Sequence, residues 1–121
     1  MDVKNKYDLE ERTAKFGENV INFLKSIKEN NISKPLINQL VRSSTSVGAN
    51  YCEADDSESP RDFKHKIGIC KKESRESKHF LRMIAVSNPE RKDEIRILWQ
   101  EAKEINLIFN AINHKLNKKN K

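Results

Sequence analysis

The sequence predicts an all-α protein, an antiparallel up-down-up-down four-helix bundle in which residues 1–121 form a single domain. Apolar residues recur at alternating spacings of three and four along four segments, the pattern of helices that each bury one stripe. Only three glycines and three prolines occur, too few for a β protein with many tight turns. Short connections between the segments favour antiparallel neighbours, and 121 residues suffice for one hydrophobic core.

The first helix is predicted over residues 8–29, before a polar stretch interrupts the periodicity. Its inward stripe consists of Leu9, Thr13, Phe16, Val20, Phe23 and Ile27. The second helix is predicted over residues 35–54, with Pro35 in the first turn, where a missing N–H is tolerated. Its inward stripe consists of Ile37, Leu40, Ser44, Val47 and Tyr51. A run of small residues over positions 43–49 has low helix propensity, so this helix depends on packing and permits close helix approach.

The third helix is predicted over residues 60–86, because Ser59 precedes Pro60 as an N-cap and Asp62 follows at the position of a capping box. Its inward stripe consists of Phe63, Ile67, Cys70, Ser74, Ser77, Leu81 and Ile84. Asn88-Pro89 separates it from the fourth helix, predicted over residues 90–116. The inward stripe of this last helix consists of Ile95, Leu98, Ala102, Ile105, Phe109, Ile112 and Leu116. Residues 114–121 are expected to form a frayed basic tail.

The fourth helix carries apolar residues outside its inward stripe, among them Ile97, Trp99, Leu107 and Ile108. Such a surplus predicts an interface between copies of the chain. Alternatively, Trp99 and Ile108 flank a wide core, and the sequence favours neither interpretation over the other.

The outward positions of the third helix are nearly all basic. The candidate nucleic-acid-binding residues are Lys64, Lys71, Lys72, Arg75, Lys78 and Arg82, with His65, Gly68 and His79 among them. They extend over roughly 27 Å, enough to follow several phosphates. The net charge of +6 favours an anionic partner. The alternative is a solvated lysine surface. Without aromatic residues interleaved on this face, recognition of backbone or shape is expected rather than base reading.

The sequence contains no pattern typical of an enzyme. Residues 53–58 are acidic but lack the ligand alternation and glycine of a calcium loop, and the three histidines are not paired at ligand spacing. There is no phosphate-binding glycine loop and no nucleophile elbow. We therefore predict no catalytic residue, metal or cofactor. Cys52 and Cys70 are interpreted as reduced structural thiols. Without a membrane span or a signal-peptide core, a cytoplasmic protein is expected.

Arg42 is predicted to lie at a polar seam with Glu73 and Glu76. If the second and third helices are antiparallel, residues whose numbers sum to about 114 lie at the same height. Arg42 then belongs either to the anion-binding surface or to ion pairs with these glutamates, and we favour the ion pairs because arginine suits paired carboxylate contacts.

Several segments resemble a known family. The stretch Gln39–Ala54 (QLVRSSTSVGANYCEA), Phe63, Ile69–Ser77 (ICKKESRES), Phe80–Arg82 and the opening Tyr7–Glu10 are similar to the bacterial four-helix bundle proteins called 23S ribosomal RNA intervening-sequence proteins. The resemblance implies a four-helix bundle that assembles as a pentamer. It also implies a nucleic-acid-associated role, by analogy with a basic pentameric accessory protein of diversity-generating retroelements. Many relatives have serine at the position of Glu73, so no role of that serine transfers, whereas Glu76 matches a recurrent glutamate.

Two hypotheses about function follow. The first is a non-enzymatic nucleic-acid-binding protein, with RNA favoured over DNA, in which an oligomer multiplies weak phosphate contacts. The alternative is a protein-interaction scaffold whose basic face docks an acidic protein.

Overall fold

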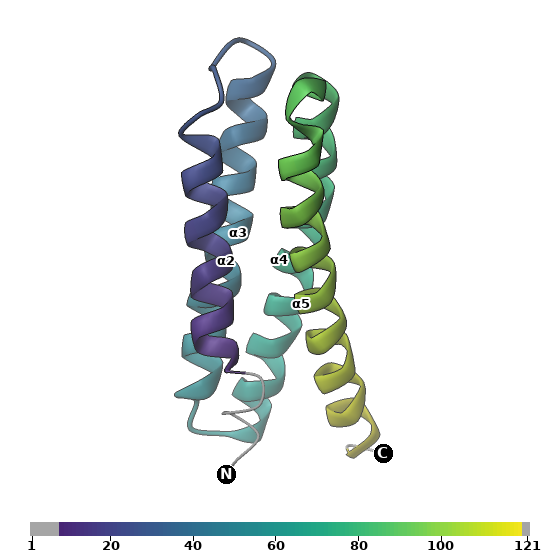
Figure 1. Cartoon of the computed structure of the whole chain (residues 1–121). Coiled ribbons are helices and arrows are strands. Elements are labelled where there is room, and N and C mark those ends of the chain that lie inside the picture. The colour runs from purple at the N-terminus through teal and green to yellow at the C-terminus, as the bar shows by residue number, and fades with distance from the viewer. Residues whose placement is uncertain (1–7, 120–121) are drawn as a thin grey trace.

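The computed structural model describes residues 8–119, which form four helices that run up, down, up and down (Figure 1). The elements are α2 (Leu9–Leu24), α3 (Ser33–Asp55), α4 (Pro60–Ser87), the short 3₁₀ helix η1 (Pro89–Arg91) and α5 (Lys92–Lys119). No strand occurs in this range. The predicted fold class and topology are confirmed.

The hydrophobic core lies where the four predicted stripes meet. Every residue of these stripes is buried or half-buried. The largest fully buried side chains include Phe16, Leu40, Leu81 and Phe109, one from each helix. Since burial of each large apolar side chain contributes about 1.5–3 kcal/mol, these stripes provide most of the favourable free energy of folding.

The first helix is shorter than predicted. α2 ends at Leu24, where the amides of Ser26 and Ile27 donate to carbonyls three residues earlier and tighten the chain into a turn. The Ser26 hydroxyl donates to the Phe23 carbonyl at 2.7 Å and stabilises that turn. Ile27 remains buried, so the apolar stripe continues one residue position beyond the end of the helix.

The remaining boundaries follow from capping and burial. α3 begins at Ser33, two residues earlier than predicted, because the Asn30 side-chain oxygen accepts from the amides of Ile32 and Ser33. The predicted start of α4 is confirmed, with Ser59 Oγ accepting from the Asp62 amide at 3.1 Å. The prediction that residues 114–121 fray is wrong for residues 114–119, which continue α5. Leu116 packs against the core there, and basic side chains are favourable near a helix C-terminus. Residues 120–121 lie outside the described range.

Small side chains line the contacts that α3 makes with its neighbours. Gly48 faces Thr13 of α2, and a Cβ at Gly48 would lie 3.3 Å from Thr13 Oγ1. On the other side of α3, Ser77 Oγ donates to Ser43 Oγ at 3.1 Å, and both serines are fully buried. These contacts explain why a segment of low helix propensity is helical: its small residues let three helices approach closely.

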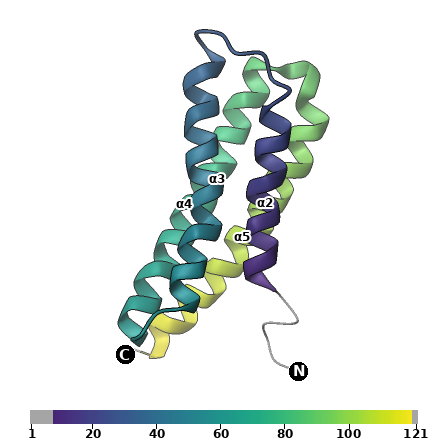
Figure 2. The same ribbon diagram turned by 90° about the vertical axis from the view of Figure 1, so that its left-hand side faces the viewer.

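The helices do not contact each other equally. α3 packs extensively on α2 and α4, and α4 on α5, whereas α2 and α5 touch at few positions. Figure 2 shows the lower half of α5 leaning away from α2 toward the turn that joins α3 to α4. Tyr51 of α3 contacts Phe109 of α5 there, with ring centroids 5.9 Å apart. α4 and α5, the two long helices, are therefore neighbours and share one outer surface of the bundle.

We predict that Leu81→Asp will largely unfold the protein. An unpaired charge in the core costs several kcal/mol against a total stability of about 5–15 kcal/mol. Circular dichroism and thermal melting provide the measurement. Ile32→Asp is the matched control, because Ile32 is 67% exposed just before α3 and should tolerate the same charge. A well-folded Leu81→Asp variant would contradict the observed burial of this residue.

Candidate nucleic-acid interface

The candidate binding residues all lie on α4, turned away from the core. Lys72, Arg75 and Arg82 are exposed, while Lys64, Lys71 and Lys78 are half-buried along the border with α5. Cys70, Ser74 and Ser77 on the opposite side of α4 are fully buried, which fixes the rotation of the helix. The basic face is therefore a consequence of how α4 packs.

None of these six cations forms an ion pair with an acid among the described residues. By contrast, Arg12, Arg42, Lys66 and Arg91 each contact a glutamate. Unpaired lysines also occur elsewhere on the surface, but here they share one helix face, and the one acid among them in the hollows, Glu76, is paired with Arg42. Like charges held this close repel one another, so an anion that bound here would remove an unfavourable interaction.

Four of the six cations line hollows along the border of α4 and α5. Lys71, Lys72 and Arg75 line one hollow of about 780 Å³. Lys64 and Lys72 line a second of about 380 Å³. Lys71 also lines a third of about 380 Å³, between α4 and the C-terminal part of α5. Lys78 and Arg82 lie farther along α4, outside these three hollows. We call the three adjoining hollows the basic groove.

α5 contributes polar residues that the sequence analysis missed. Asn113 lines all three hollows of the basic groove. It belongs to a row on the α4-facing side of α5 that consists of Asn106, Asn110, Asn113 and Asn117. The row repeats at helical spacing, which was a detectable signal, but only the packing shows that it lies beside the lysines of α4.

Asn106 has a structural role at the buried end of this row. Its amide donates to the Lys71 carbonyl at 2.9 Å and to Ser74 Oγ at 3.0 Å, which ties α5 to α4. The side chains of Asn110, Asn113 and Asn117 form no hydrogen bond with the described residues. Their amides are available to a ligand.

Gly68 lies within the basic groove, in the interior of α4. A Cβ at this position would meet no atom within 4 Å, so packing inside the chain does not require glycine. Glycine in a helix interior is about 1 kcal/mol less favourable than alanine. Gly68 lines two of the hollows, beside Lys71 and Lys72 in one and beside Lys64 and Lys72 in the other, and fills neither with a side chain.

Arg42 lies where the register argument predicted, beside both glutamates. Arg42 Nη1 is 3.0 Å from Glu73 Oε2, and Nη2 is 2.6 Å from Glu76 Oε1. The Glu73 side chain is only 11% exposed, whereas that of Arg42 is 45% exposed. Glu76 lines the basic groove, so this pairing compensates a carboxylate that lies among the lysines.

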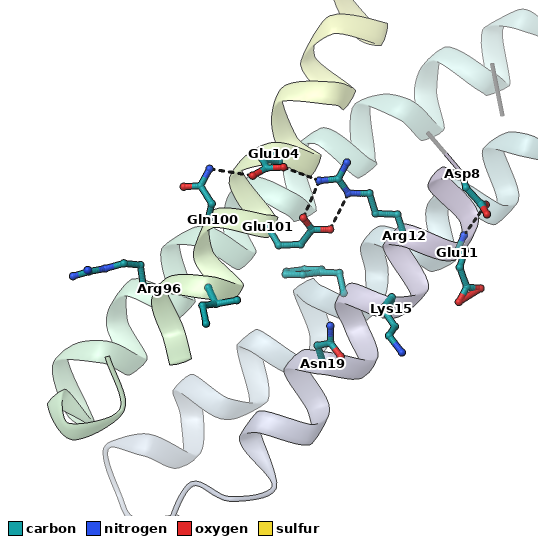
Figure 3. Close-up of a pocket in the computed structure, with 11 residues that line it drawn as sticks. Asp8, Glu11, Arg12, Lys15, Asn19, Arg96, Gln100, Glu101 and Glu104 are labelled. Atoms are coloured by element: carbon teal, nitrogen blue, oxygen red, sulfur yellow. Dashed lines mark hydrogen bonds and ion pairs between the residues drawn. The ribbon is translucent and has the colours of Figure 1, made fainter. Parts of the chain in front are cut away.

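A second arginine, which the sequence analysis did not single out, joins α2 to α5. Figure 3 shows Arg12 reaching across to Glu101 and Glu104 in a groove of about 860 Å³. Two of its nitrogens lie 2.8 Å from the two oxygens of Glu101, and Nη2 lies 3.0 Å from Glu104. The hydrogen bond to Glu101 raises the pKa of Arg12 above its ordinary value. Arg12 thus links two helices that touch at few positions. Because its charge is already compensated by the two glutamates, it is a poor candidate for binding anions.

The predicted interface residues of α5 do not share one face. Trp99 lies on the side of α4, with the Lys78 and Lys103 ammonium groups each 5.6 Å from its ring. Trp99 and Ile108 are half-buried against the core. Ile97 and Leu107 are 72% and 54% exposed, and Ile97 lines the α2/α5 groove. Ile97 and Leu107 are therefore the members of this set that remain available for a contact between chains.

The two cysteines differ in their surroundings. Cys70 is fully buried, and desolvation raises the pKa of its thiol to about 12, so the thiol stays protonated and unreactive at neutral pH. Both thiols are free, as the interpretation of reduced cysteines requires, but Cys52 is exposed on α3 and does not pack in the core as Cys70 does. It occupies an outward position between the inward residues Tyr51 and Ala54.

Residues 8–119 contain neither a metal-binding cluster nor a membrane-spanning helix. No group of three or more histidines, cysteines or carboxylates comes close enough together to hold a metal ion. None of the helices in that range has the length and apolar character needed to cross a membrane.

Fold and surface together define the class of protein: a small antiparallel four-helix bundle with a basic groove along its third and fourth helices. The chain belongs to the 23S rRNA-intervening sequence protein family, whose model matches residues 5–111. The family inferred from the motifs of α3 and α4 is thereby confirmed.

A solved structure supports the same assignment. The chain is similar to a protein of unknown function from the S23 ribosomal protein family of Bacteroides thetaiotaomicron, with a TM-score of 0.76 and 25% sequence identity. The match covers 87% of this chain and 97% of the other. No curated protein of similar sequence was found.

We predict that Arg42→Ala will lower stability by about 1–2 kcal/mol, and that nucleic-acid affinity per folded molecule will fall only as far as the uncompensated Glu76 carboxylate repels phosphates. The loss follows because Glu73 keeps a mostly buried carboxylate without its charged partner. Thermal melting at fixed protein concentration measures the effect. Glu73→Gln in the Arg42→Ala background should restore part of the loss. If Arg42→Ala weakens binding without changing the melting temperature, Arg42 belongs to the binding surface.

Proposed function

We propose that this chain is a non-enzymatic, cytoplasmic RNA-binding protein that acts through the basic face of α4. The observation that carries the proposal is the row of six cations on that face, none of them neutralised by an acid of the described chain. Phosphates of a polynucleotide match such a row in charge and in length.

Two further observations support RNA as the ligand. The family is named for an element of 23S ribosomal RNA, which favours RNA over DNA. Lys71, Lys72 and Arg75 border a hollow instead of projecting separately into solvent, so a bound backbone would contact several of them at once. Phosphate contacts of this kind position a nucleic acid without reading its sequence.

The proposal includes assembly into an oligomer, with five chains as the family resemblance implies. Ile97 and Leu107 are large apolar side chains that water contacts in the single chain. Burying them between copies is favourable, and repeating the basic face around a ring would multiply weak contacts into avidity.

We predict that Lys71→Gln/Arg75→Gln will weaken binding to single-stranded RNA and flatten its dependence on salt. The slope of log affinity against log salt should fall by about 1.4, because each phosphate contact contributes about 0.7 for a single strand. Fluorescence anisotropy across a salt series measures both quantities. Lys15→Gln/Lys34→Gln removes the same charge from exposed positions on α2 and α3 and serves as the control.

The same experiment distinguishes the RNA-binding hypothesis from the scaffold hypothesis. A Lys71/Arg75 variant that binds RNA as tightly as the parent at every salt concentration would refute the proposal. The scaffold hypothesis would then predict that this variant loses an acidic protein partner, measured by pull-down from nuclease-treated lysate.

We predict that light scattering will report an oligomer, and that Ile97→Asp/Leu107→Asp will shift it toward the monomer. Charges in an apolar contact between chains are costly, whereas the same charges on a solvated helix surface are tolerated. Ile32→Asp should leave the molar mass unchanged. A parent protein that stays strictly monomeric at high micromolar concentration would show this part of the proposal to be wrong.

A further inference from the structure

The basic groove is asymmetric in its chemistry. Its α4 wall carries cations, including Lys71 and Lys72, whereas its α5 wall carries amides. Asn113 is half-buried and lines all three hollows, and the neighbouring Asn110 and Asn117 line the hollow toward the C-terminus of α5. Cations are suited to phosphates, but amides, which both donate and accept, are suited to hydroxyls and base edges.

We propose that the groove binds a single strand of RNA, with its phosphates on the α4 wall and its ribose hydroxyls and base edges on Asn110 and Asn113 of the α5 wall. This inference rests on the proposed function and adds what the groove recognises besides charge.

The position of Asn113 favours a single strand over a duplex. Its amide is recessed between two helices, where an unpaired nucleotide can enter. An A-form duplex keeps its bases stacked and paired, and it shows hydroxyls and base edges only across a wide, shallow minor groove, so none of its nucleotides can enter a hollow between two helices. Within residues 8–119 the Asn110 and Asn113 amides have no hydrogen-bond partner, so they are available to such a nucleotide.

Gly68 adds an independent argument. A Cβ there would meet no other atom within 4 Å, so packing inside the chain does not require glycine, and the missing side chain leaves room in the groove. Room beside Lys64, Lys71 and Lys72 is what a close approach by a sugar-phosphate backbone requires.

The test compares a single-stranded RNA of about 20 nucleotides, longer than the roughly 27 Å of basic surface, with the DNA of the same sequence. The parent should bind the RNA more tightly. Asn110→Ala/Asn113→Ala should weaken RNA binding by about 5- to 50-fold, since two hydrogen bonds are lost, and should bring the RNA and DNA affinities together. The salt slope should stay unchanged because no charge is removed. Asn22→Ala/Asn38→Ala, at exposed sites on α2 and α3, is the matched control.

Gly68→Leu provides a second variant that does not depend on the asparagines. Leucine has the higher helix propensity and meets no neighbour at its Cβ, so the melting temperature should not fall, while RNA binding should weaken. A Gly68→Leu variant that binds RNA as tightly as the parent would overturn the inference.

The other outcomes distinguish this inference from the proposed function. If Lys71→Gln/Arg75→Gln loses affinity but the Asn110/Asn113 variant keeps its preference for RNA, the asparagines do not read the ligand and only this inference is wrong. If the Lys71/Arg75 variant is unaffected, the proposed function is wrong and this inference with it. Tighter binding of duplex than of single-stranded RNA by the parent would also overturn the inference.

Discussion

The close approach of α3 and α4 is the constraint on which the rest of the structure depends. Ser43 and Ser77 meet at this contact with their hydroxyl oxygens 3.1 Å apart. Larger side chains at these two positions would push α3 and α4 apart. The contact fixes the rotation of α4 about its own axis. Because Cys70, Ser74 and Ser77 must face inward, the residues half a turn away must face solvent, and these include Lys72, Arg75 and Arg82.

The same contact explains the electrostatics of the surface. Arg42 of α3 lies opposite Glu73 and Glu76 of α4 and pairs with both. The two carboxylates on the flank of α4 are thereby neutralised, and the unpaired cations stay on the outer face and on the border with α5. Buried polar groups are satisfied throughout the described chain, so the serine-rich contact carries no penalty from unpaired hydroxyls. Packing, ion pairing and the uncompensated positive charge are thus three results of one helix orientation.

The second long contact, between α4 and α5, contains both structural hydrogen bonds and candidate ligand-binding side chains. Asn106 fastens the helices through Lys71 and Ser74, while Asn113, two turns farther along, lies in the basic groove. Trp99 lies at the other end of the contact, beneath the ammonium groups of Lys78 and Lys103. One helix border therefore serves both as a structural seam and as the wall of a candidate binding site. α2 takes little part in this border, and Arg12 links it to α5 through Glu101 and Glu104.

The sequence by itself determined the fold class, the four inward stripes and the basic face of α4, because helical periodicity is a local property that residue spacing reveals. It also predicted the Arg42 contacts, since antiparallel helices joined by a short turn fix which residues share a height. The end of α2 at Leu24 was not predictable from the stripe, because Ile27 is buried by a turn as well as it would be by a helix. Only the tertiary structure placed Asn113 and Gly68 in one groove, because the lateral neighbours of a helix depend on how whole helices pack rather than on local spacing.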